Sequence, residues 1–418
     1  MTSNQAGLNI LRLPRARLPL FLAVFIDIFS FGLMYPLIVG LFHTGWIAHF
    51  YSPAARDGFL SLAFSLFPIG MFFGASLLGD LSDALGRRRT LMICMAGLAG
   101  SYALMWASLE LHIVWLFLVG RLASGLMAGT APIAQAAMMD TAPPDQRAAA
   151  MAQVTLVNTF GFVIGPAIGG LLGHLDFRLP IGVALILCLL TLATLGSTTL
   201  SGDKPKKRFS FDWREPFLLF ARMRGRPALI TAVAAFFLFQ FGYMIYYTFI
   251  LIVMQRQYGF STAQVGLFAM VMGVGCVIGT AFGYKLAVRF LGDDTRVAKA
   301  SLAACGLVVA VTALPMPAAA QVVLTLVAAI TNLPAFVTLL AAIASGVEAT
   351  EQGWALGIGT ASIALSVFAA GLLSSLLSII PGAAFLALGG LLILCSLVPA
   401  RRLAATVNAA LPTEGSAA

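Results

Sequence analysis

The feature that most constrains this chain is a succession of apolar stretches, each about as long as a membrane is thick. A helix needs about 20 apolar residues to cross the hydrocarbon core of a bilayer. The sequence predicts twelve such spans: 18–42, 58–79, 90–108, 113–135, 148–172, 179–199, 228–252, 263–284, 297–315, 320–345, 353–379 and 382–399. Because 60% of the residues are hydrophobic and only 10% are charged, we expect an all-α membrane protein with twelve transmembrane helices.

The basic residues are distributed unevenly between the connections. If the N-terminus lies in the cytoplasm, all but four of the 25 Lys and Arg residues fall in cytoplasmic segments. The exceptions are Arg56, Arg178 and Arg256 outside and Arg121 within a span. This asymmetry follows the positive-inside rule and predicts a protein of the inner (plasma) membrane with both termini in the cytoplasm. The net charge of +9 then indicates membrane lipid, and not nucleic acid, as a partner.

Several other classes of protein are disfavoured by what the sequence contains. The first span is about 25 residues long and no cleavage pattern of small residues follows it, so we expect a spanning helix and not a removable signal. The five cysteines lie in apolar spans without paired spacing, which predicts neither disulfides nor a metal site. No catalytic triad or phosphate-binding glycine loop is found. We therefore expect no enzyme and no cofactor.

A basic segment divides the spans six and six. We predict an N-terminal six-helix bundle at 1–199, a cytoplasmic basic linker at 200–227 and a C-terminal bundle at 228–418. The linker is either an amphipathic piece on the inner leaflet or a solvated connection. Residues 145–149 and 351–355 are similar at an offset of 206, and the loops that begin at 79 and 283 at an offset of 204. Such repeats commonly build transporters with a substrate site near the midplane.

The connection after the second span reads GDLSDALGRRRT (79–90). It resembles the loop pattern G-x-x-x-D-R/K-x-G-R-R/K of the major facilitator superfamily, and five residues match it: Gly79, Asp83, Gly86, Arg87 and Arg88. Ala84 stands where the pattern has a basic residue. The resemblance implies a conformational gate in which Asp83 meets the positive end of the eleventh helix near Gly353. Alternatively, the arginines only anchor the topology.

Two further spans carry similar signatures. In the fourth span, Arg121 with Gly125 resembles the family's R-x-x-x-G motif; the alternative is that Arg121 extends to the outer surface. The fifth span resembles the GxxxGPxxGG signature of the family's exporters, and the matching residues are Gly161, Gly165, Pro166, Gly169 and Gly170. Glycines at this spacing permit close helix packing and proline bends a helix, so a purely structural role is the alternative.

Asp27 is an acid well inside a span, in the sequence DIFSFGLMYP. This segment resembles the first helix of tetracycline efflux proteins. A carboxyl group in a medium of low polarity can gain and lose a proton near neutral pH, so we expect Asp27 to couple transport to protons, with Arg121 assisting. The alternative is a structural role, including a pair between the two residues.

Other polar residues are candidates for the wall of a substrate cavity. They are Ser30, Asn158, Gln240, Tyr243, Tyr247 and Asn332. Three of them, Gln240, Tyr243 and Tyr247, share one face of the seventh helix, although such a stripe is more often used for packing. The weak match of the second half argues against tetracycline itself as substrate.

Together these features predict a monomeric, proton-coupled transporter that exports an amphipathic organic drug or metabolite by alternating access. Its expected partners are a small organic substrate, protons and membrane lipids. The alternatives are proton-linked uptake of a metabolite or siderophore, and a membrane sensor or scaffold that does not transport.

Overall fold

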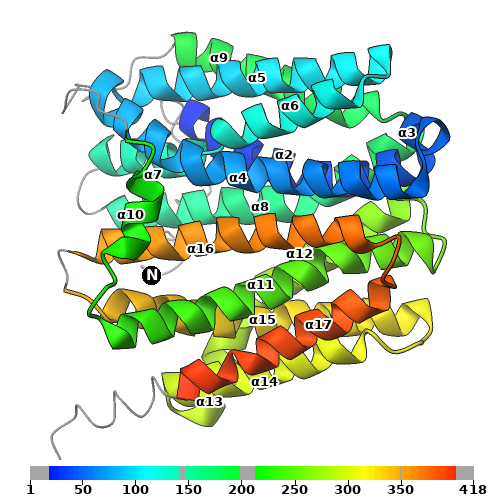
Figure 1. Ribbon diagram of the computed structural model, residues 1–418. Helices are drawn as coiled ribbons and strands as arrows, with labels where there is room; N and C mark the ends of the chain where they lie inside the picture. The colour runs from blue at the N-terminus through cyan, green and yellow to red at the C-terminus, as the bar shows by residue number, and fades with distance from the viewer. Residues whose placement is uncertain (1–17, 142–145, 198–211, 349–350, 402–418) are drawn as a thin grey trace, which may run out of the picture. The chain divides into compact units, whose positions relative to one another are not determined.

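The computed structural model describes residues 18–141, 146–197, 212–348 and 351–401. These residues form long helices joined by short connections, with no strand among them (Figure 1). The described residues do not include residues 1–17, the predicted linker up to residue 211, or residues 402–418. The all-α fold class is therefore confirmed for the part of the chain that carries the spans.

The helices follow the predicted spans closely. In the first half they are α2 (Leu18–Thr44), α3 (Trp46–Phe50), α4 (Pro53–Leu85), α5 (Arg87–Leu111), α6 (Val114–Leu126), α7 (Thr130–Thr141), α8 (Arg147–Leu175) and α9 (Arg178–Ser197). In the second half they are α10 (Glu215–Ala221), α11 (Pro227–Arg256), α12 (Thr262–Ile278), α13 (Tyr284–Leu291), α14 (Asp294–Val311), α15 (Ala318–Ser345), α16 (Gln352–Leu372) and α17 (Gly382–Cys395). A π-helical turn, η3 (Gly279–Gly283), joins α12 to α13, and a 3₁₀ turn, η5 (Leu373–Leu376), follows α16.

Eleven helical stretches of the described residues are long and apolar enough to cross a membrane. The remaining predicted span corresponds to α14, which has 18 residues and carries Asp294, Arg296 and Lys299 in its first two turns. Those charges lower its mean hydropathy, while the rest of the helix buries Leu302, Cys305 and other apolar residues. A helix therefore lies within each of the twelve predicted spans, but only eleven helical stretches in the described part of the chain are long and apolar enough to cross a membrane.

The chain divides into two compact units. The first comprises Met1–Trp213, Met254–Gly273 and Gly371–Ser378, and the second comprises Arg214–Val253, Val274–Ala370 and Ile379–Ala418. In the first unit, α2 packs along α8 and also contacts α7 and α9, while α6 packs against both α4 and α5. In the second unit, α14 packs against α15 and α17. The domain boundaries predicted from the sequence stay a prediction.

In the first unit α8 packs closely on α2, and glycine makes this possible. A Cβ atom on Gly165 would lie 2.6 Å from the carbonyl oxygen of Phe29, and one on Gly161 would lie 3.2 Å from that of Phe25. The ring of Pro166 fills the space beside Gly32. Glycines allow the two backbones to approach, which is how membrane helices gain packing energy without a hydrophobic driving force between them.

The fourth span differs from its prediction as one helix over 113–135. It is broken at 127–129, between α6 and α7. The physical reason is Pro132, which has no backbone N–H and whose ring would clash with the carbonyl of Ala128 in a continuous helix. Pro132 is instead the third residue of α7, where the N–H groups have no partner within the helix in any case.

Candidate functional site

Asp27 lies on α2 opposite the break in the fourth span. Its Oδ2 atom accepts a hydrogen bond from the backbone N–H of Ala131, at 3.3 Å. The hydroxyl and backbone N–H of Thr130 also lie within hydrogen-bonding reach of the carboxyl group. Because the N-terminus of a helix carries about half a positive charge, the first turn of α7 is a favourable place for an ionised carboxylate.

Arg121 has separate partners. Its side chain is buried, its Nε atom donates to the carbonyl oxygen of Ala63 at 3.1 Å, and its guanidinium group lies 4.7 Å from the centre of the Phe67 ring. Among the described residues, Arg121 forms no ion pair with a carboxylate. A carbonyl and an aromatic face therefore compensate the burial of this cation. The alternative, in which the Arg121 side chain extends to the outer surface, does not agree with the structure.

Tyr102, a buried residue of α5, links the surroundings of these two residues. The charges of both Arg121 and Asp27 act on its phenol group. Sequence reasoning missed it, although a single tyrosine in the middle of an apolar span is a signal that could have drawn attention. Thr130 was missed as well, because nothing in the sequence shows that it faces the first helix.

The loop predicted as a gate is held by ionic contacts within the first unit. Gly86, at φ +93°, separates α4 from α5, in a backbone region that side chains disfavour. Arg87 contacts Asp83 at 3.2 Å and Asp140, in the last turn of α7, at 3.5 Å. The predicted contact of Asp83 with residue 353 stays a prediction.

Arg88 contacts a different helix from Arg87. Its guanidinium group donates to the carbonyl oxygens of Leu195 and Gly196, both at 2.8 Å. These are among the last carbonyls of α9, which have no partner within their own helix. A cation at a helix C-terminus is favoured by the helix dipole, so Arg88 fixes α5 to the end of α9.

The glycine-rich motif of α8 packs on two sides. Gly165 and Gly169 face the backbone of α2, while Gly170 faces Gly266 of α12, whose Cα atom a Cβ on Gly170 would approach to 2.6 Å. The motif is therefore at least a packing device, in line with the structural alternative. Its connection with export is a separate prediction.

The predicted cavity residues differ in their environments. In the first unit Ser30 is buried and Asn158 is partly exposed. In the second unit Gln240, Tyr243, Tyr247 and Asn332 are all buried. The side-chain oxygens of Asn158, Gln240 and Asn332 are enclosed and accept no hydrogen bond. A buried carbonyl oxygen without a donor costs free energy, so these three amides are the strongest of the six candidates.

A charged cluster lies where α2, α4 and α11 meet at the predicted outer side of the first unit. Asp57, at the start of α4, is only 2% exposed and is paired with Arg256 at the end of α11. The Nε atom of Arg256 also donates to Nε2 of His43, at 3.0 Å. The sequence analysis placed Arg256 outside but did not connect it with Asp57, which lies 199 residues away.

The start of α16 is tied to the segment before α11 in the second unit. Arg226 donates two hydrogen bonds to Glu351, at 2.7 and 2.9 Å, and stacks over the Trp354 ring. The Trp354 indole N–H donates to the carbonyl of Leu219 in α10. The hydrogen bonds from Arg226 lower the pKa of Glu351 below its ordinary value. Part of the predicted linker is thus a short helix with defined contacts.

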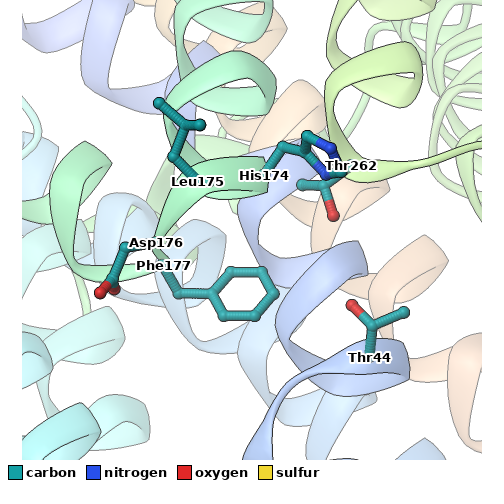
Figure 2. Close-up of a pocket in the computed structure, with 7 residues that line it drawn as sticks. Thr44, His174, Leu175, Asp176, Phe177 and Thr262 are labelled. Carbon is teal, nitrogen blue, oxygen red and sulfur yellow. The ribbon is translucent and has the colours of Figure 1, made fainter.

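A small open cavity of about 370 Å³ lies at the ends of α2 and α8 and the start of α12. Figure 2 shows Thr44, His174, Asp176, Phe177 and Thr262 around it. Thr44 is 17 residues beyond Asp27 on the same helix, which corresponds to about 25 Å. The cavity contains none of the predicted substrate residues, so it is separate from the candidate site. Within the described residues, no cluster of His, Cys, Asp or Glu suits a metal ion.

Long apolar helices, an intramembrane acid and the glycine- and arginine-containing loop at 79–90 define a polytopic membrane transporter. The sequence profile of the Major Facilitator Superfamily matches residues 20–349, and the chain belongs to this family.

Individual relatives are more distant. The class C tetracycline resistance protein of Escherichia coli is 27% identical over 66% of this chain and 67% of its own length. The class D protein of Salmonella ordonez is 31% identical, over 39% of each chain. The crystal structure of the human organic anion transporter MFSD10 (TETRAN) superposes with a TM-score of 0.66 at 20% identity, covering 94% of this chain and all of the other. At this sequence identity the superposition is evidence of a shared fold only.

Proposed function

We propose that this protein is a proton-coupled secondary transporter of the inner membrane that exports an amphipathic organic drug or metabolite by alternating access. The observation that carries the proposal is the setting of Asp27. This acid lies within a membrane span, is partly exposed, and among the described residues is paired with no cation. An intramembrane acid is rare and costly, and it typically marks an ion or proton pathway.

In the proposed cycle, Asp27 takes up a proton from the outer side as the substrate leaves, and releases it to the cytoplasm when new substrate binds. Arg121 is proposed to change the proton affinity of Asp27 between the two states. A membrane potential of 100 mV contributes about 2.3 kcal/mol for each charge moved. One or two protons per cycle are therefore enough to drive substantial accumulation.

Amide side chains in each of the two units are proposed to recognise the substrate. The enclosed oxygens of Asn158, Gln240 and Asn332 accept no hydrogen bond, so each could receive one from an N–H or O–H group of a ligand. Such acceptors on an apolar background suit an amphipathic molecule with hydrogen-bond donors. The names of the tetracycline resistance relatives support export of such a compound.

The first experiment identifies a usable substrate. Growth with and without the gene is compared across a panel of compounds that includes tetracycline, ethidium and carboxyfluorescein. The compound with the largest effect is then followed in everted and right-side-out membrane vesicles. Uptake into everted vesicles supports export, whereas uptake into right-side-out vesicles supports the metabolite-importer alternative.

The second experiment tests proton coupling in liposomes that contain the purified protein and a pH-sensitive dye. We expect a pH gradient to drive accumulation by the natural protein and by Asp176→Asn, which changes an exposed acid, but not by Asp27→Asn. Transport by Asp27→Asn that follows the gradient as before would show that another group carries the proton. Binding of the compound without any flux would support a sensor.

A further inference from the structure

The broken fourth span provides a physical connection between the proposed proton site and the cytoplasmic loop. Its inner half, α7, is a separate helix of 12 residues, which is about 18 Å long. One end of α7 presents the N–H of Ala131 to Asp27, and the other end carries Asp140, which is paired with Arg87. A short helix held by a hydrogen bond at one end and an ion pair at the other can move as one body.

Asp27 acts on this helix as a cap supplied by a neighbouring span. The first N–H groups of any helix lack partners within the helix, and a side-chain oxygen that accepts from them stabilises the helix start. Normally a residue of the same chain segment provides that oxygen. In this protein it comes from α2, because the break before Thr130 exposes the N–H groups directly opposite Asp27.

The charge of Asp27 is the main electrostatic variable at this contact. The titratable groups that interact with it are Cys94 and Tyr102 on α5 and Cys188 on α9. Thiols and phenols are uncharged at neutral pH in their ordinary range. The charged residues of α7 and α8 lie at the far ends of those helices, and Arg121 on α6 contacts Ala63 and Phe67.

The Thr130 hydroxyl can change its hydrogen-bond partner with the protonation state of Asp27. Its Oγ1 atom lies 3.4 Å from the carbonyl oxygen of Ala23, one turn earlier on α2, and also reaches the Asp27 carboxyl group. A hydroxyl group has one hydrogen to donate and can accept through its lone pairs. It can donate to an ionised Asp27, or donate to Ala23 and accept from a protonated Asp27.

We propose that Thr130 is a positioning residue that couples the proton on Asp27 to the break in the fourth span. Ionised Asp27 holds the first turn of α7, and protonation weakens this hold while the Thr130 hydroxyl turns to Ala23. The released α7 then transmits the change to Arg87 and the loop at 79–90. This inference rests on the proposed function, because it takes Asp27 as the proton site.

The experiment measures amide hydrogen exchange by mass spectrometry in the purified full-length protein, with no substrate. Peptides from α7 report the contact, and peptides from α6 serve as the internal control. In Asp27→Asn, which mimics the neutral acid, we expect about tenfold faster exchange in α7, equivalent to about 1.4 kcal/mol, with α6 unchanged. Thr130→Val removes the hydroxyl at nearly constant shape and should act in the same direction, whereas Thr130→Ser should resemble the natural protein.

Exchange in α7 that is equal in the natural protein, Asp27→Asn and Thr130→Val would overturn the inference. Equal acceleration in Thr130→Ser and Thr130→Val would also overturn it, because the hydroxyl would then be irrelevant. The result is independent of the transport assay. If Asp27→Asn keeps normal proton coupling yet loosens α7, the proposed function loses its carrier while the cap is upheld.

Discussion

The packing of α8 on α2 makes a quantitative prediction about Gly165. In Gly165→Ala the new methyl group would lie 2.6 Å from the carbonyl oxygen of Phe29, whereas ordinary contacts begin at 3.4 Å. The two helices must therefore separate by close to 0.8 Å, the difference between these distances. The atom in the way belongs to a helix backbone, which cannot rotate aside. Overpacking of this kind costs about 1–3 kcal/mol.

Gly100→Ala is the matched control. Gly100 also lies inside a membrane span, on α5, but a Cβ atom there would have no neighbour within 4 Å. Without a clash, the change removes only the conformational freedom of glycine, and it should stabilise the helix by up to about 1 kcal/mol. The two substitutions add the same methyl group, so any difference between them reports the helix contact.

Both variants are compared by unfolding in mixed micelles with increasing sodium dodecyl sulfate, followed by circular dichroism. We expect Gly165→Ala to unfold at a lower mole fraction of the denaturant than the natural protein, and Gly100→Ala at an equal or higher one. If Gly165→Ala is as stable as Gly100→Ala, the close approach of α2 and α8 is not a packing constraint and the reasoning is wrong.

Three further predictions concern charged contacts. Hydrogen bonds from Arg226 lower the pKa of Glu351 below its ordinary value of 4.5. The stabilising effect of Glu351 is therefore present above that ordinary value and is lost as the pH falls through the lowered pKa. Glu351→Gln should flatten that part of a stability-against-pH curve. Removing the cation in Arg256→Gln leaves buried Asp57 unpaired and should cost about 1–3 kcal/mol, and adding Asp57→Asn should recover part of this loss in a double-mutant cycle; additive effects would deny the pair. Arg88→Ala should cost about 1 kcal/mol through the loss of its bonds to the end of α9, and Arg88→Lys less, as measured by thermal unfolding.

In the proposed coupling through α7, the loop at 79–90 has a second role beside anchoring the topology. Arg87 joins Asp83 on its own loop to Asp140 on α7. A shift of α7 by even a fraction of its length would change this arrangement, because ion pairs weaken steeply beyond contact distance. The ionic contacts of Arg87 would then depend on the protonation state of Asp27, although the two residues lie at opposite ends of α7.

The sequence by itself determined the spans, and did so for a simple reason. An apolar stretch of about 20 residues has one stable form in lipid, a helix that satisfies its own backbone, so the predicted ranges agree with α2, α4, α5 and most of the others. The acid at Asp27 and the loop motif at 79–90 were also found, because a charge in a span and a fixed spacing of glycine and arginine are visible without any fold.

Tertiary structure alone decided which of these residues meet. Pro132 is plain in the sequence, yet whether it bends or breaks a helix depends on what caps the freed N–H groups. That cap comes from Asp27, which lies 104 residues before Ala131. The pairing of Asp57 with Arg256 and the burial of Arg121 against Ala63 and Phe67 have the same origin. Hydrophobic pattern fixes how long a membrane helix is, whereas side-chain shape and unsatisfied polar groups select its neighbours.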